Sequence, residues 1–112
     1  MSRSEIIDRD EKLEAALADV ASIEPEFEKA LLDYATAETN YRIRKSEEYL
    51  KAEGTEKARE ATAIVAVKKL LAERDRAEAV KDFLKVKIKD RQDAVSARQS
   101  LLSAEVKTNQ RF

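Results

Sequence analysis

The sequence predicts an all-α protein, built as a long antiparallel helical hairpin of the coiled-coil type. Charged residues make up 40% of the 112 residues and aromatic residues only 5%. Glycine and proline occur once each, at Gly54 and Pro25. Apolar residues recur every seven positions on both sides of Gly54, which is the spacing of coiled-coil helices. Together these observations favour long amphipathic helices over a sheet or a compact α/β domain.

The first arm of the hairpin is predicted over residues 4–53. Its larger apolar residues form a row with a period of seven, which indicates one side of a helix–helix seam. Leu17 and Leu31 are expected to add a second row, four positions after members of the first. The seam residues predicted for this arm are Ile6, Leu13, Val20, Phe27, Tyr34 and Tyr41.

Pro25 divides the first arm into the predicted segments 4–22 and 24–53. Proline has no amide hydrogen to donate inside a helix, but it is tolerated in a first turn. We therefore expect Ser22 to cap a new helix and the arm to be kinked or broken near Pro25. The apolar row keeps its phase across this point, so both segments should present the same face. An alternative is that residues 4–22 fold back as the third member of a short bundle.

Gly54 and Thr55 mark the predicted turn, at residues 54–55. Gly54 is predicted at the C′ position of the first arm, where left-handed backbone favours glycine. Thr55 is predicted as the N-cap of the next helix, and Glu56 places an acidic side chain in its first turn. Residues 1–112 are predicted to form a single helical domain.

The second arm is predicted as one helix over residues 55–108, because this range contains neither glycine nor proline. Two adjacent heptads, RQDAVSA at 91–97 and RQSLLSA at 98–104, indicate one constant face. Arg91 and Arg98 are expected close to the seam, where a buried polar group would set the register of the helices. The apolar row of this arm is Ile64, Leu71, Val80, Leu84, Ile88, Val95 and Leu102, with Leu84, Ile88, Val95 and Leu102 predicted in the hairpin seam.

The two predicted arms have matched lengths of roughly 75 and 80 Å, at about 1.5 Å per helical residue. A reversal at Gly54 therefore fixes which residues meet across the hairpin. The expected neighbours are Ile6 and Leu102, Leu13 and Val95, Val20 and Ile88, Tyr34 and Arg74, and Tyr41 and Val67.

A hairpin of two helices buries only a thin core and is marginally stable alone. The second arm also carries apolar residues outside the predicted seam. We expect these side chains to face a second copy, which would give a dimer with an elongated four-helix bundle, or to face a different protein. They are Val65, Leu70, Phe83, Val86 and Leu101.

The composition argues against an enzyme and against a bound cofactor or metal. The chain has no cysteine and no histidine, which removes thiolate ligands and the commonest general base. No Walker loop, glycine-rich dinucleotide turn or zinc-ligand spacing occurs. No apolar run approaches the roughly 18 residues of a membrane span, and the N-terminus is too charged for a signal peptide. A cytoplasmic protein without membrane contact is expected.

Basic residues are unevenly distributed, because acidic residues dominate the first half of the chain and basic residues the second. Two halves that pack on each other and neutralise their charges would explain this, as would an acidic partner or a nucleic acid. Arg42, Arg44 and Lys45 lie beside Tyr41 and Tyr49, and such a group suits phosphates and unpaired bases. Alternatively, Tyr41 continues the seam and the three cations form a solvated face.

A second basic group follows one face of the predicted second arm. Lys81, Lys85 and Lys89 are four residues apart, so they lie on the same side of a helix and suit a phosphate backbone. The alternative is a solvated row, or one paired with acids on another helix. The acids expected in that case are Glu24, Glu26 and Glu28.

Part of the sequence resembles a known kind of protein. The pattern Tyr41-Arg42-x-x-Lys45, Tyr49-Leu50, Gly54-Thr55 and Arg59-Glu60-Ala61, followed by a long charged helix, resembles small uncharacterised helical proteins of tailed bacteriophages. These are often encoded in replication and recombination gene clusters. The resemblance covers roughly residues 30–108, and it implies a phage origin and an accessory role beside recombination or replication enzymes. It assigns no residue a chemical role.

The expected function is that of a non-enzymatic, homodimeric interaction protein, which modulates recombination or replication proteins in the host cytoplasm. One alternative is direct binding of single-stranded nucleic acid through Arg42, Arg44, Lys45 and the lysine row. Another is a component of virion assembly or scaffolding.

Overall fold

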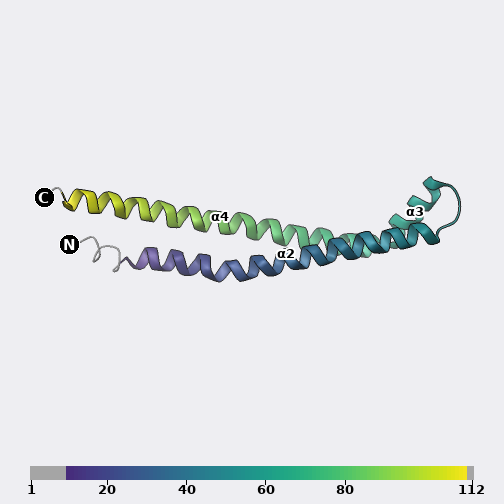
Figure 1. Cartoon of the computed structure of the whole chain (residues 1–112), viewed down its shortest axis with the longest axis horizontal. Coiled ribbons are helices and arrows are strands. Elements are labelled where there is room, and N and C mark those ends of the chain that lie inside the picture. Colours follow the sequence, from purple (N-terminus) through teal and green to yellow (C-terminus); the bar gives the residue numbers. More distant parts are fainter. Residues whose placement is uncertain (1–9, 111–112) are drawn as a thin grey trace. The chain divides into compact units, whose positions relative to one another are not determined.

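The computed structural model describes residues 10–110 and confirms the all-α hairpin class. Figure 1 shows the helices α2 (Glu11–Lys51), α3 (Glu56–Ala66) and α4 (Lys68–Gln110), and no strand occurs in this part of the chain. Ile6, a predicted seam residue, lies outside the described residues. No helix from residue 10 to residue 110 combines the length and the apolar character that crossing a bilayer requires.

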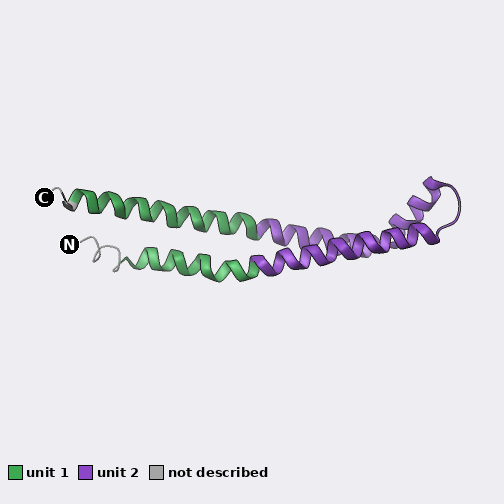
Figure 2. Ribbon diagram, in the orientation of Figure 1, with its two compact units in different colours: residues 1–26, 84–112 green, residues 27–83 purple. Residues whose placement is uncertain are grey.

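The chain divides into two compact units, which Figure 2 shows in different colours. One unit contains residues 1–26 and 84–112, and the other contains residues 27–83. In each unit, a segment of α2 lies antiparallel to a segment of α4, and the second unit also holds α3. That the chain forms a single domain stays a prediction.

Helix α2 begins at a capped end that its sequence provides. The Asp10 carboxylate accepts a hydrogen bond from the Leu13 amide at 2.6 Å, which satisfies one of the free N–H groups of the first turn. Glu11 and Glu14 lie in the first turn and Lys51 lies in the last turn. Acids at the N-terminus and bases at the C-terminus interact favourably with the helix dipole.

The large apolar residues of α2 follow the predicted row, but the expected second row is wrong. Leu13 is buried, and the later members of the row are half-buried. Leu17 and Leu31 are 47% and 42% exposed, whereas Ile23 and Ala30 are buried. The second row therefore comes three residues after the first, at the spacing that alternates with four in a heptad.

The helix continues through Pro25, so a break at this point is wrong, whereas a kink near Pro25 stays a prediction. Ser22 does not cap a new helix, because its hydroxyl donates to the Asp19 carbonyl at 2.9 Å within the same helix. Pro25 is exposed, and its ring costs α2 one backbone hydrogen bond without disturbing a buried layer. The alternative in which residues 4–22 fold back is also wrong for its described part, because residues 11–22 continue α2.

The predicted turn has the backbone that its residues favour. Gly54 has φ +105°, a conformation that side chains with a Cβ atom rarely adopt. Thr55 has extended backbone and accepts a hydrogen bond from the Ala58 amide at 3.2 Å, as an N-cap does. Because α2 ends at Lys51, Gly54 lies three residues beyond the last helical residue rather than directly after it.

The second arm is interrupted at Val67, so the prediction of one helix over 55–108 is wrong. Val67 has φ −104° and ψ 14°, while its amide still donates to Ala63 and its carbonyl accepts from Leu71. Ala63 and Val67, on either side of the end of α3, are both fully buried. Ile64 and Val65 add β-branched side chains, whose helix propensity is low.

The buried core is small in each unit. In the first unit, Leu13, Leu102 and Val106 form a buried cluster against which Val95 packs. The partner expected for Leu13 was Val95, so its buried neighbour Leu102 lies one heptad further along α4 than the prediction placed it. Ile23, Leu84 and Ile88 are also buried there. In the second unit, the buried residues are Ala30, Ala63 and Val67. Small side chains thus dominate the second core.

Candidate interaction surface

Asp10 and Arg98 form the best-defined ion pair between the arms. Arg98 Nε lies 3.1 Å from both carboxylate oxygens, and its terminal nitrogen donates to Oδ2. The side chain of Asp10 is 7% exposed and that of Arg98 is 27% exposed. The Arg98 hydrogen bonds hold the pKa of Asp10 below its ordinary value, although desolvation opposes this. Arg98 therefore lies at the seam, where the sequence placed it.

Other ion pairs also join the two arms within the units. Asp19 Oδ2 lies 3.9 Å from Arg91 Nε in the first unit, and Glu38 Oε2 lies 3.5 Å from an Arg74 nitrogen in the second. With Asp10 and Arg98, these pairs set acids of the first arm against bases of the second. This arrangement agrees with mutual neutralisation of the oppositely charged halves.

Basic side chains of α4 lie over the rings of two seam tyrosines. The Arg74 guanidinium lies 4.7 Å from the centre of the Tyr41 ring, and Lys81 Nζ lies 4.5 Å from the centre of the Tyr34 ring. The predicted register placed Arg74 at Tyr34, so the pairing in this unit differs by one heptad. The predicted register assumed one uninterrupted second arm, whereas α3 and α4 are separate helices. One face of each ring is thus covered by a cation.

The first basic group is engaged by acidic side chains. Arg42 lies 3.7 Å from Glu38, and Arg44 lies 3.0 Å from Glu48. Lys45 reaches from α2 to Glu60 on α3 at 3.1 Å, and this contact raises the pKa of the lysine. Two of these three cations pair within their own helix, at the spacing of one turn.

The second basic group, the lysine row, pairs within α4. Lys81 lies 3.3 Å from Asp82, and Lys89 lies 3.8 Å from Asp93, while Lys85 is exposed. The partners expected for this row were Glu24, Glu26 and Glu28, and the observed partners are acids of its own helix.

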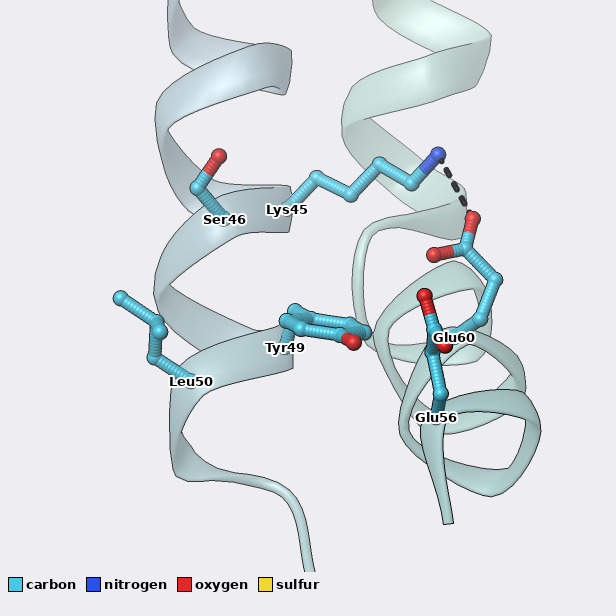
Figure 3. A pocket seen from close by; sticks show the side chains of 6 residues that line it. All are labelled: Lys45, Ser46, Tyr49, Leu50, Glu56 and Glu60. Atoms are coloured by element: carbon cyan, nitrogen blue, oxygen red, sulfur yellow. Dashed lines mark ion pairs between the residues drawn. The ribbon is translucent and has the colours of Figure 1, made fainter.

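A groove opens where α2 meets α3 near the turn, and Figure 3 shows the side chains that line it. Its volume is about 490 Å³. Tyr49 points from α2 towards α3, and Lys45 bridges to Glu60 above it, while Leu50 points away. The lining of the groove combines the Tyr49 ring, the ion pair of Lys45 with Glu60 and a further acid, Glu56, and it offers no nucleophile–base pair.

A smaller groove in the same unit has a floor of small side chains. Its volume is about 210 Å³, and Ala30 of α2 and Ala77 of α4 belong to its lining. Both acidic and basic side chains line this groove. The other lining residues are Asp33, Glu73, Arg76 and Val80.

Large apolar side chains remain exposed on all three helices. Leu50 is 77% exposed, Val65 is 71% exposed and Phe83 is 64% exposed. Of the residues expected outside the seam, Val65, Phe83, Val86 and Leu101 are exposed, and Leu70 is half-buried. Within residues 10–110, no three acidic side chains converge in a way that would hold a metal ion.

Comparisons with protein-family models, curated proteins and solved structures return no match. The resemblance to phage proteins therefore stays a prediction.

Sequence reasoning missed Asp10 and the alanine-floored groove. An Asp three residues before Leu13 is an N-cap signal, but the helix was expected to begin at residue 4, which hid it. Ala30 and Ala77 each follow a half-buried residue by three positions, which is the heptad signal for a seam position. Their small size concealed that signal.

Proposed function

We propose that the chain is a non-enzymatic helical interaction protein that forms a homodimer. We further propose that it is phage-encoded and acts in the host cytoplasm as an accessory or modulator of recombination or replication proteins. The resemblance of residues 30–108 carries the second part of this proposal, and the structure of the helix faces supports the first.

The observation that supports an interaction function is the apolar surface left outside the seam. Val65, Phe83 and Leu101 are each more than half exposed, although removing their apolar side chains from water is favourable. The cores of both units are small, so burial against a partner would add substantially to stability. A protein surface is the partner that best matches these side chains.

Direct binding of single-stranded nucleic acid is the second candidate, and exposed lysines favour it. Lys85 is exposed, and the pair between Lys89 and Asp93 is long and exposed, so both cations are available to phosphates. The tyrosines weigh against this candidate. Stacking on Tyr34 or Tyr41 would require the base to compete with Lys81 or Arg74.

Light scattering on a sizing column tests both candidates, with and without single-stranded DNA at two salt concentrations. We expect twice the mass of one chain at micromolar concentrations and no DNA complex at moderate salt. A DNA complex that weakens steeply with salt would favour the nucleic-acid binder instead. A matched variant, Lys85→Glu with Lys89→Glu, should lose such a complex and keep the dimer.

The accessory role is tested by capture from lysates of infected cells. The wild-type chain is the bait, and the matched control carries Val65→Ser and Leu101→Ser, since both residues are exposed and outside the core. A recombination or replication protein that the wild type retains and the control loses would support the role. Equal recovery of all such proteins by both baits would contradict it.

A further inference from the structure

A single residue separates α3 from α4, and helical hydrogen bonds reach it from both sides. Helix α3 ends at Ala66 and α4 begins at Lys68. The Val67 amide donates to the Ala63 carbonyl at 3.1 Å, and the Leu71 amide donates to the Val67 carbonyl at 2.9 Å. Both bonds join residues four apart, as in an α-helix. The backbone angles of Val67, φ −104° and ψ 14°, depart from helical values. A rotation centred on this residue would therefore join α3 and α4 into one helix.

The register of the second unit leaves the second arm longer than the first. The Arg74 guanidinium lies 4.7 Å from the centre of the Tyr41 ring, so these two residues are nearly level. From Tyr41 to Lys51, α2 rises by about 15 Å, at about 1.5 Å per residue. From Arg74 back to Glu56, a straight helix would rise by about 27 Å. A straight second arm would thus extend about 12 Å beyond α2.

The turn is long enough to allow a straight second arm. An overhang of about 12 Å and a distance between helix axes of about 9 Å combine to about 15 Å. The extended chain from Lys51 to Glu56 can span up to roughly 17 Å, at about 3.3–3.6 Å per residue. The connection between α2 and α3 therefore permits both a bent and a straight arm.

Few contacts hold α3 in the bent position. The buried side chains of this segment, Ala63 and Val67, are both small. Within residues 10–110, the pair of Lys45 with Glu60 is the only ion pair that joins α3 to another helix. Its side chains are 32% and 50% exposed, and such pairs contribute little to stability. A straight arm would give up this pair, but it would regain the helical hydrogen bonds that the interruption removes.

We infer that α3 is a hinged segment with two positions. In the bent position, which the structure holds, Lys45 bridges to Glu60 above Tyr49, and the groove between α2 and α3 is formed (Figure 3). In the straight position, α3 continues α4 as one helix. Glu60 then lies about 15 Å further along the direction of α2, in the register of Tyr41 and Arg74. The groove is taken apart, so a ligand of the groove would select the bent position. This switch lies within the second unit and does not depend on the proposed dimer.

Spin labels can measure the two positions, because the chain has no cysteine of its own. Thr36 of α2 and Ala61 of α3 are both exposed, so Thr36→Cys with Ala61→Cys places one label on each helix. Dilution with unlabelled chain removes distances between copies. Pulsed dipolar spectroscopy should show mainly the shorter distance of the bent position. The straight position should add a population about 10 Å longer.

Charge reversal at the ion pair tests what holds the bent position. Glu60→Lys should raise the fraction of the longer distance about threefold, because Lys45 then faces a like charge. Adding Lys45→Glu should restore the original fraction. The matched control is Glu56→Lys, since Glu56 belongs to the same helix and has no ion-pair partner within residues 10–110. It should leave the distances unchanged.

Substitution of the hinge residue separates straightening from unwinding. Val67→Ala removes a buried side chain and favours helix, so it should also raise the fraction of the longer distance. Helicity by circular dichroism should stay the same or rise. A broadened distance distribution with lower helicity would mean that α3 unwinds, and it would overturn the inference. Unchanged distances in both Glu60→Lys and Val67→Ala would overturn it as well. Neither result bears on the dimer, which light scattering tests separately.

Discussion

The Asp10 carboxylate is shared between two helices, since it caps α2 through the Leu13 amide and binds the Arg98 guanidinium of α4. A planar guanidinium that contacts both carboxylate oxygens fixes direction as well as distance. The pair therefore ties the start of α2 to one position along α4 within the first unit.

Removing this pair should lower the Tm of the protein. Asp10→Asn loses the charge of the shared carboxylate, and Arg98→Met leaves a carboxylate that is only 7% exposed without its cation. The double variant should lose less than the sum of the two single losses, because both changes remove the same interaction. Thermal melts followed by circular dichroism measure these shifts.

The matched control for that cycle is Arg91→Met. Arg91 lies 3.9 Å from Asp19, and both side chains are exposed, so its loss should change Tm little. A larger shift for Arg91→Met than for Arg98→Met would contradict the importance of the Asp10 pair.

Acid should weaken the contribution of Asp10 to stability. The pKa of this carboxyl is lowered in the folded chain, mainly by Arg98, so its contribution is complete above the unfolded pKa of about 4. The contribution is lost as the pH falls through the lowered folded pKa. The difference in Tm between wild type and Asp10→Asn should therefore shrink as the pH falls below about 4. A constant or growing difference would show that the carboxylate charge is not what stabilises the fold.

Substitution of Thr55 should reveal how much the N-cap of α3 stabilises the fold. Thr55→Ala removes the acceptor for the Ala58 amide and should lower the free energy of unfolding by about 1 kcal/mol. Thr55→Ser keeps the hydroxyl and should retain most of this stability. Urea titrations of both variants make the comparison, and equal losses would mean that the hydroxyl does not act as the cap.

The bend at Val67 should resist larger side chains beside it. Ala63 is fully buried, so Ala63→Leu should overpack the second unit and cost about 1–3 kcal/mol. Ala66→Leu is the control, because Ala66 is exposed on the same helix and should tolerate the same change. If urea midpoints fell equally for both variants, the loss would reflect helix propensity rather than packing.

The helical arms and the turn could be predicted because large apolar residues with a period of seven mark a seam, and Gly54 with Thr55 marks a reversal. The second row was misplaced because leucine is more apolar than alanine. At close helix contacts, however, small Ala30 is the residue that fits. Neither Gly nor Pro marks the bend at Val67, and the β-branched Ile64 and Val65 give only a weak local signal. The burial of Ala63 and Val67, which is visible only in the folded chain, accompanies the bend.

Within the candidate surface, the partners of Arg42 and Arg44 follow from the one-turn spacing of a helix, but the partner of Lys45 does not. Glu60 lies on another helix, and only the folded reversal brings it to Lys45. The half-buried Arg74 and Lys81 were also difficult to predict, because their aliphatic stems lie along the seam while their charges reach the tyrosine rings.

The central claim is that this thin hairpin is completed by self-association, and its most direct test is the dependence of stability on protein concentration. Urea unfolding followed by circular dichroism should be measured at about 1 µM and about 100 µM chain. Because a dimer is stabilised by mass action, the midpoint should rise with concentration, by up to about 2.7 kcal/mol in free energy of unfolding. An unchanged midpoint across this range, in a chain that light scattering finds monomeric, would contradict the claim.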